Sequence, residues 1–257
     1  MTASAGDVDG GREDDVQARR HHGRYQVRRV ARMLIASLKP RTMGGTTNTG
    51  LLAYALARAG HPVTCYDADE SLQLAAWARD AGDFPCEVHV ADTPAFAEVV
   101  YPEMDHDRIN LVDAGHAENH PDIVDSILEV VDLVILTLSP TQPDYDRLTK
   151  PERGTALAKV IKRSAALRES GQPPVTYVLL NRCQAGAASP KKYADLLRNG
   201  GEDGTDPKWS VLSTQIPRRE GIASAVGFPC DKPERRAPYD ALVTELTQRG
   251  HLPGVRR

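Results

Sequence analysis

The chain contains 257 residues, of which 40% are hydrophobic and 26% are charged. This composition is ordinary for a globular protein and supplies enough apolar side chains for a substantial core. The net charge of −3 excludes a polycation, so contact with nucleic acid would need a local basic patch. No run approaches the roughly 18 apolar residues of a membrane-spanning helix, and the N-terminus lacks the apolar segment of a secretory signal. We therefore expect a cytoplasmic protein with no membrane partner.

The four cysteines are widely spaced and form no Cys-x-x-Cys pair. This pattern is unlike the paired ligands of zinc and iron–sulfur sites, or the framework of a disulfide-rich domain. We interpret Cys65, Cys86, Cys183 and Cys230 as reduced thiols, although residues distant in the sequence can meet in a fold.

Residues 1–30 are rich in Gly, Asp, Arg and His and poor in large apolar side chains, which predicts a flexible N-terminal tail. The second half of this segment is basic, with Arg19, Arg20, Arg24, Arg28 and Arg29. Two interpretations remain open: an arm that contacts DNA or a partner, and a solvated tail without a role. The charge pattern alone favours the second.

From residue 31 onward, short apolar runs alternate with segments of helical periodicity. Strands are predicted at 31–38, 62–69, 86–92, 108–115, 132–140, 174–183 and 210–216. Helices are predicted at 51–60, 71–82, 121–131, 144–169, 190–199 and 239–249. Strands that alternate with helices indicate right-handed βαβ units. The predicted fold is α/β, a mostly parallel twisted sheet with helices on both faces, in one domain that spans residues 31–257.

The loop after the first predicted strand is the most informative one, because ligands of such sheets bind beyond the carboxyl ends of the strands. It reads Thr-Met-Gly-Gly-Thr-Thr-Asn-Thr over residues 42–49 and leads into a helix. Glycines let backbone N–H groups approach an anion, and a helix N-terminus adds unpaired donors and a favourable dipole. The arrangement predicts a phosphate-binding loop.

With this loop, residues 34–71 resemble the start of the ParA/MinD-type ATPases, a deviant-Walker group of P-loop proteins. That family shows Lys-Gly-Gly-x-Gly-Lys-Thr-Thr, of which Gly44, Gly45 and Thr49 are matched here. Its second strand ends in Asp-x-Asp, which Asp67 and Asp69 match.

Three later segments match the family in the family's own order. They are an apolar strand that ends at Asp113, a strand that ends near Asn181, and the segment 216–219 around Pro217. The resemblance covers about residues 31–250 and implies the P-loop NTPase fold. The order of the motifs is more specific than any single motif.

The resemblance implies ATP or ADP as the ligand and Mg²⁺ as the metal. In it, Thr49 and Asp113 hold the Mg²⁺, Asp67 lies near the magnesium shell, and Asp69 is the catalytic acid that activates water. The nucleotide-binding residues that it implies are Gly44, Gly45, Thr46, Thr47, Asn48, Thr49, Gly50, Asn181 and Pro217.

The loop departs from the family pattern at both lysines. The first lysine falls at Met43, the second falls at Asn48, and the glycine before the second falls at Thr47. An amide can donate a hydrogen bond but carries no charge, and loss of a charge-assisted contact to phosphate costs about 1.5–3 kcal/mol. Lys39 and Arg41 lie just upstream and could substitute, but their place at the strand end rather than on the loop weighs against this.

The candidate site residues also have structural interpretations. Asp67 and Asp69 could be a polar strand end that caps a helix, although their convergence with the loop and Asp113 favours the functional interpretation. Asn181 could read an adenine edge through its amide, or could serve a turn or a cap.

A basic face is the candidate for DNA contact. Its residues would be Arg218, Arg219, Arg235 and Arg236, together with Lys191 and Lys192. Solvated surface charge is the default interpretation of such residues.

Three functions remain. In a ParA-like ATPase, ATP favours a homodimer, the dimer binds DNA nonspecifically on the nucleoid, and a ParB-like partner stimulates hydrolysis during plasmid or chromosome partitioning. In a non-hydrolysing pseudo-ATPase scaffold, the fold persists with a degenerate nucleotide site, as Met43 and Asn48 suggest. A MinD-like protein usually ends in an amphipathic membrane helix, and the terminal sequence GHLPGVRR is a poor match to one. The sequence leaves open whether ATP is hydrolysed.

Overall fold

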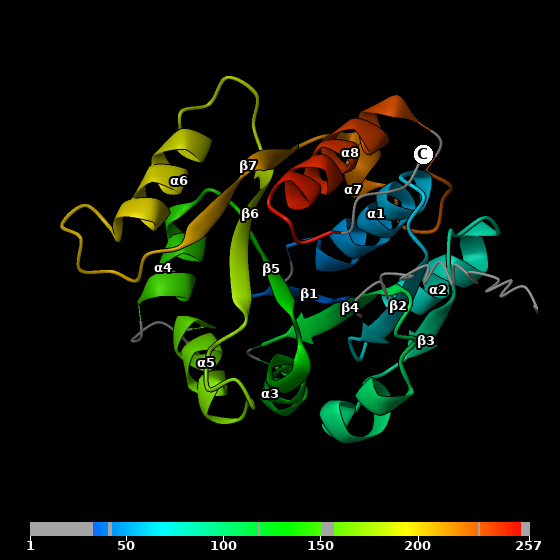
Figure 1. Ribbon diagram of the computed structural model, residues 1–257. Helices are drawn as coiled ribbons and strands as arrows, with labels where there is room; N and C mark the ends of the chain where they lie inside the picture. The colour runs from blue at the N-terminus through cyan, green and yellow to red at the C-terminus, as the bar shows by residue number, and fades with distance from the viewer. Residues whose placement is uncertain (1–32, 41–42, 118, 151–156, 231, 253–257) are drawn as a thin grey trace, which may run out of the picture.

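Seven parallel strands form one continuous sheet, which Figure 1 shows at the centre of the protein. The computed structural model describes residues 33–40, 43–117, 119–150, 157–230 and 232–252. Over this range the strand order is β3-β2-β4-β1-β5-β6-β7. The strands are β1 (Met33–Lys39), β2 (Val63–Ala68), β3 (Val88–Val90), β4 (Ile109–His116), β5 (Leu133–Leu138), β6 (Val175–Cys183) and β7 (Ser210–Pro217).

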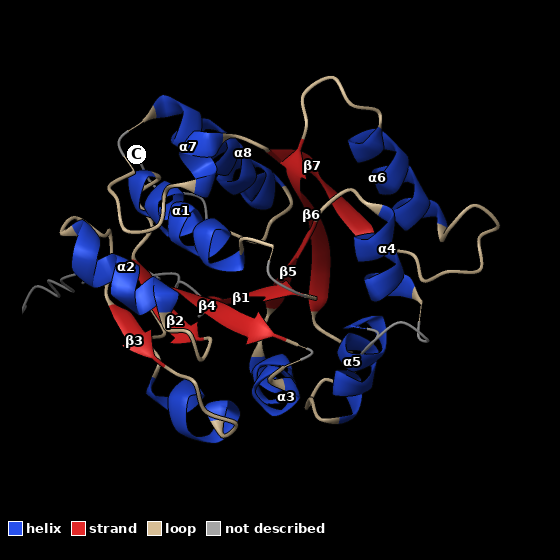
Figure 2. Ribbon diagram, turned by 180° about the vertical axis from the view of Figure 1, so that it is seen from behind, coloured by secondary structure: helices blue, strands red, loops and turns tan. Residues whose placement is uncertain are grey.

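Helices cover both faces of this sheet (Figure 2). One face carries α1 (Gly45–Arg58), α2 (Gln73–Ala81), α7 (Glu220–Ala223) and α8 (Pro233–Gln248). The other carries α3 (Pro121–Val130), α4 (Gln142–Thr149), α5 (Leu157–Arg163) and α6 (Ser189–Asn199). Short irregular helices, η1 (Phe96–Val100), η2 (Tyr101–Glu103) and η3 (Ser164–Ala166), complete the described elements.

The core consists of two apolar layers, one on each face of the sheet. Along β1, Ile35 packs into the layer under α1 and α8, whereas Leu34 and Ala36 pack into the opposite layer. This alternation follows from the two-residue period of a strand. A strand buried on both faces needs apolar residues at nearly every position, which explains why the central strands were visible as continuous apolar runs.

The predicted α/β fold is confirmed, with a parallel sheet and helices on both faces. Each of the seven predicted strands is present. The helix boundaries are less accurate, because α1 begins at Gly45 rather than at residue 51, and α8 begins at Pro233 rather than at 239. The first turn of α1 is the polar loop sequence, which has no apolar periodicity, and Pro233 occupies the favoured first position of α8.

The single helix predicted over 144–169 is wrong. The structure has α4, which ends at Thr149, and α5, which begins at Leu157. Lys150 is extended, with φ −95° and ψ 113°, and it precedes Pro151. A proline disfavours the helical conformation of the residue before it, so the helix ends there.

Three other expectations concerned the N-terminal tail, membrane-spanning helices and the cysteines. The predicted tail, residues 1–30, lies outside the described residues. None of the described helices is long and apolar enough to cross a membrane. All four cysteines are free thiols, and the fold brings Cys65 Sγ within 3.4 Å of Cys86 Sγ.

The contact between α1 and α2 depends on a glycine. The Trp77 side chain on α2 is buried, and its Nε1–H donates to the Phe228 carbonyl over 3.0 Å. The ring lies against Gly50 on α1 so closely that a Cβ at position 50 would lie 2.2 Å from Trp77 Cζ3. Gly50 therefore serves the packing of the two helices.

We expect Gly50→Ala to lower the free energy of unfolding by about 1–3 kcal/mol, because the added methyl group overlaps the Trp77 ring. Urea denaturation measures the change. Gly221→Ala is the control, since a Cβ there would lie 3.5 Å from Glu234 Cγ, which is ordinary contact. An unchanged midpoint for Gly50→Ala would contradict the tight packing of α1 on α2.

Candidate functional site

The candidate site lies where the carboxyl ends of the parallel strands meet. The chain leaves β1 at Lys39 and enters α1 at Gly45, and Gly44 caps the helix with φ 80° and ψ 32°. This left-handed conformation is favourable only for glycine among the common residues. It aims the N-terminus of α1, with its unpaired N–H groups, at the edge of the sheet.

Asn181, near the end of β6, braces this loop. Its Nδ2 donates to the Met43 carbonyl over 2.7 Å, and its Oδ1 accepts the Arg182 N–H over 2.8 Å. Arg182 has φ 56°, so the same amide also supports a strained backbone position. Met43 itself is buried, and the residue that replaces the first family lysine therefore packs into the core.

Two open cavities flank the loop. The larger, about 580 Å³, lies toward β6 and β7 and includes Asn181, Pro217, Arg218 and Arg219 in its lining. The smaller, about 540 Å³, lies toward β2 and includes Lys39 and Asp69. Gly44 and Thr47 line both cavities, so the loop lies between them.

A buried cation, the Lys39 ammonium, lines the smaller cavity. Lys39 Nζ lies 3.2 Å from Asp69 Oδ2 and 3.5 Å from Asp113 Oδ1. The Lys39 side chain is 4% exposed and that of Asp113 is 0% exposed, so water screens this ion pair weakly. Three different strands supply the three charges, β1 for Lys39, β4 for Asp113, and the end of β2 for Asp69.

The ionisation states follow from these contacts. Burial lowers the pKa of Lys39, but the carboxylates of Asp113 and Asp69 more than offset it, so this pKa lies above its ordinary value. Burial raises the pKa of Asp69, but the Ser71 N–H and the Lys39 ammonium bring it below its ordinary value. Burial raises the pKa of Asp113, and Lys39 offsets this only in part. Lys39 is therefore an ammonium ion.

Thr49 of α1 also contacts Asp113. The Thr49 hydroxyl lies 3.4 Å from Asp113 Oδ1 and 3.1 Å from the Gly45 carbonyl. Asp113 Oδ2 is buried and has no hydrogen-bond partner among the described residues. The predicted metal ligands Thr49 and Asp113 are thus adjacent.

Asp67 is oriented differently. Its Oδ1 accepts the Asp69 N–H over 3.2 Å, and its Oδ2 accepts the Ala75 N–H over 2.9 Å. Burial raises the pKa of Asp67 to about 6, against the lowering effect of the Ala75 N–H. Both oxygens therefore accept backbone N–H groups, one from the β2–α2 connection and one from α2, and the role of Asp67 in metal binding stays a prediction.

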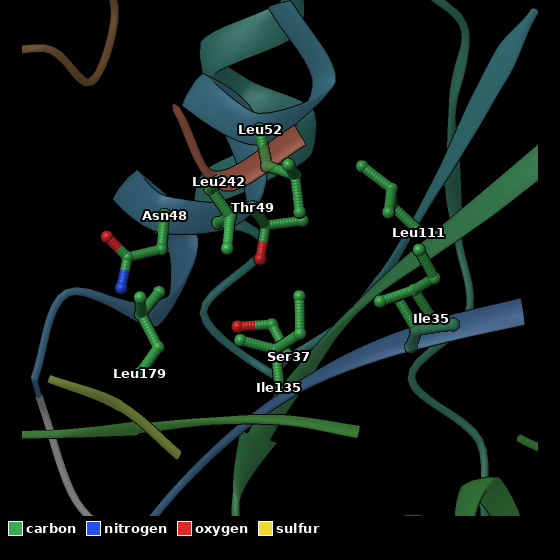
Figure 3. Close-up of a pocket in the computed structure, with 10 residues that line it drawn as sticks. Ile35, Ser37, Asn48, Thr49, Leu52, Leu111, Ile135, Leu179 and Leu242 are labelled. Atoms are coloured by element: carbon green, nitrogen blue, oxygen red, sulfur yellow. The ribbon is translucent and has the colours of Figure 1, made fainter. Parts of the chain in front are cut away.

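Asn48, at the position of the second family lysine, is 4% exposed and tied to the core. Its Nδ2 donates to Thr137 Oγ1 on β5 over 3.1 Å, and its Oδ1 accepts the Tyr239 hydroxyl of α8 over 2.7 Å. Figure 3 shows Asn48 and Thr49 extending from α1 toward the sheet, around a pocket of about 10 Å³ that Ser37 also lines. The amide therefore links α1, β5 and α8.

The structure separates the predicted basic residues. Arg218 and Arg219 are exposed beside the larger cavity. Arg235 is buried, and its Nη1 donates to the Pro229 carbonyl, while Arg236 Nε donates to the Cys230 carbonyl. Arg235 and Arg236 therefore serve the packing of the 229–230 segment, and an exposed basic face cannot include Arg235.

Sequence reasoning missed the Asn48 partners Thr137 and Tyr239. It also weighed against Lys39, which lies inside the site. The signal for Lys39 was available, because a lysine at the end of a buried strand in a parallel sheet reaches the same edge as the strand-end acids. No local signal pointed to Tyr239, which lies 191 residues from Asn48.

The donor set fits an anionic nucleotide. Gly44 and Gly45 allow backbone approach, the α1 N-terminus favours negative charge, and Lys39 places an ammonium in the same cavity. The fit to a divalent cation is poor in this arrangement. The Lys39 ammonium already lies within 3.5 Å of both Asp69 and Asp113, so it offsets part of the negative charge that would attract the metal.

Comparison with known proteins gives structural matches. No protein-family model matches the chain, and no curated protein matches its sequence. The complex of a McdA variant from Cyanothece with ATP has a TM-score of 0.64 at 10% identity, over 89% of this chain and 100% of that chain. A protein assigned to plasmid partition in Borrelia burgdorferi B31, bound to AMPPNP, has a TM-score of 0.62 at 10% identity, over 85% and 99%.

The septum site-determining protein MinD from Pyrococcus horikoshii OT3, in complex with Mg-ADP, has a TM-score of 0.59 at 17% identity, over 85% of this chain and 97% of that chain. At such identities the likeness establishes the fold. The chain has the α/β P-loop fold of the ParA/MinD/McdA-type ATPases, as the order of its motifs predicted.

We expect Tyr239→Phe to lower the free energy of unfolding by about 1–3 kcal/mol, because Asn48 Oδ1 loses its donor inside the core. Combined with Asn48→Leu, the same change should cost much less, since both buried polar partners are then absent. A double-mutant cycle by urea denaturation measures the coupling. Additive effects of the two changes would show that Asn48 and Tyr239 do not depend on each other.

Proposed function

We propose that the chain is a ParA-like protein that binds ATP or ADP across the loop 43–49. The observation that carries this proposal is the left-handed Gly44 at the N-terminus of α1, between two cavities at the carboxyl edge of a parallel sheet. The phosphates would lie against the loop and α1, where backbone N–H groups and the helix dipole favour an anion.

The larger cavity is the candidate for the base. Asn181 and Pro217 line it, and both are among the nucleotide-binding residues that the family resemblance implies. The Asn181 amide holds the Met43 carbonyl, so a base placed against β6 would meet a residue that also shapes the phosphate loop. Asn181 would therefore contact the base and position the loop that binds the phosphates.

The cellular role that we propose is DNA partitioning. Nucleotide binding would favour a homodimer, which would bind DNA nonspecifically through exposed arginines that include Arg218 and Arg219, and a ParB-like partner would stimulate ATP hydrolysis. The match to a protein assigned to plasmid partition supports this role. The exposure of both arginines at the carboxyl edge of the sheet supports a basic surface beside the nucleotide.

A second candidate, a non-hydrolysing scaffold, is favoured by the condition of the catalytic parts. Asn48 is bound to Thr137 and Tyr239, and Asp69 accepts bonds from Lys39 and Ser71, so neither side chain is free to act. ATP turnover discriminates the two functions. Turnover that Asp69→Ala abolishes supports the ATPase, and nucleotide binding without turnover supports the scaffold.

We expect Gly44→Ala to weaken ATP and ADP binding by about five- to thirtyfold, because the loop cannot keep φ 80° without a cost of about 1–2 kcal/mol. Isothermal titration calorimetry measures both affinities. Gly82→Ala is a matched control, since Gly82 has φ 72° at the end of α2 and no neighbour within 4 Å of an added Cβ. Equal affinity for the Gly44 and Gly82 variants would remove the loop from the nucleotide site.

We expect the double variant Arg218→Ala, Arg219→Ala to weaken nonspecific DNA binding in the presence of ATP, and to reduce the slope of log K against log salt by about two. Fluorescence anisotropy with a labelled duplex at several salt concentrations measures this. The control removes two exposed arginines on other helices, Arg79 of α2 and Arg198 of α6. ATP affinity is measured for the same variants, and unchanged DNA binding at unchanged ATP affinity would exclude this basic surface.

A further inference from the structure

The Lys39 side chain contacts the loop as well as the neighbouring strands of the sheet. Its side chain lies over Gly45, where an added Cβ would come within 2.5 Å of Lys39 Cδ and 2.8 Å of Lys39 Nζ. Gly45 thus leaves the space through which the lysine reaches Asp69 and Asp113. The ammonium lies beside the first turn of α1, inside the cavity that the loop lines.

The ammonium interacts with the same carboxylates that a divalent cation would use. Asp69 and Asp113 bring two negative charges, and Lys39 supplies one positive charge between them at 3.2 and 3.5 Å. A Mg²⁺ ion needs oxygen ligands in near-octahedral geometry and gives up its water reluctantly. Beside a fixed ammonium it would also meet electrostatic repulsion that the weakly solvated site screens little.

A purely structural ion pair would not account for this arrangement. Burying charged groups is costly, and a buried ion pair often adds little to stability compared with apolar packing. Lys39 lines a cavity of about 540 Å³ rather than a closed core, together with Gly44, Gly45, Thr46 and Thr47. An ammonium has three N–H donors, so one donor remains for a ligand after the two carboxylates are served.

We propose that the Lys39 ammonium replaces Mg²⁺ as the cation of this site, so that the nucleotide phosphates bind without a divalent metal. This proposal rests on the proposed nucleotide binding. Lys39 supplies from the end of β1 the positive charge that is absent at Met43 and Asn48. The carboxylates of Asp69 and Asp113 hold the ammonium in place for the phosphates.

The first test compares ADP affinity in Mg²⁺ and in EDTA by calorimetry. We expect the unmodified protein to change by less than about threefold, and Lys39→Met to bind about ten- to a hundredfold more weakly in EDTA. Lys39→Arg, which keeps the charge, is the control and should retain more affinity than Lys39→Met. A requirement for Mg²⁺ in the unmodified protein, with at least tenfold weaker binding in EDTA, would overturn the proposal.

The second test uses no nucleotide and titrates the protein with Mn²⁺, followed by electron paramagnetic resonance. We expect no binding to the unmodified protein at millimolar metal, and binding to Lys39→Met, because the two carboxylates then lack a counter-ion. The double variant Lys39→Met, Asp69→Asn should lose this binding again. Circular dichroism establishes that each variant is folded.

The two tests fail in different ways. If no form of the protein binds ADP, the proposed function fails, while the Mn²⁺ titration still decides whether Lys39 takes the place of a metal. If the unmodified protein binds Mn²⁺ at micromolar concentration, Lys39 moves aside for the metal and the inference is overturned. Should Lys39→Met not fold, the two measurements on the unmodified protein decide the question.

Discussion

The ion triad of Lys39, Asp69 and Asp113 depends on the parallel register of three central strands. In that register Ser37 of β1 pairs with Asp113 of β4, and Asp67 of β2 also pairs with Asp113. The strand ends that follow these pairs therefore emerge side by side. Lys39 of β1 reaches Asp113 of the adjacent strand β4 and Asp69, which follows β2, one strand further away. Because all three groups are buried or nearly so, the charges hold one another, and removal of Lys39 would leave two carboxylates without a counter-ion.

The proposed phosphate loop combines a backbone suited to an anion with side chains that pack into the core. Gly44 and the α1 N-terminus retain the geometry that suits an anion. Asn48 has instead become a core residue, because its amide satisfies one group on β5 and another on α8. The loop thus supplies backbone N–H donors at the N-terminus of α1, while Lys39 at the end of β1 supplies the positive charge.

Much of the fold could be predicted because its physical signals are local. The central strands are buried on both faces and so appear as apolar runs, and the alternation with helices implied a parallel sheet. The limits of this reasoning are equally physical. The first turn of α1 is polar, so periodicity placed the helix start too late, and the effect of Pro151 on Lys150 was overlooked in a segment that otherwise reads as helical.

The sequence by itself determined the fold class, the glycine-rich loop before α1 and the set of acids at the strand ends, since each depends on residue type and spacing along the chain. Only the tertiary structure decided how these residues pair. Lys39 meets Asp113 across 74 positions, and Asn48 meets Tyr239 across 191. Hydrogen bonds and ion pairs act over a few ångströms, so their partners are selected by strand order and helix packing, which no local pattern of residues records.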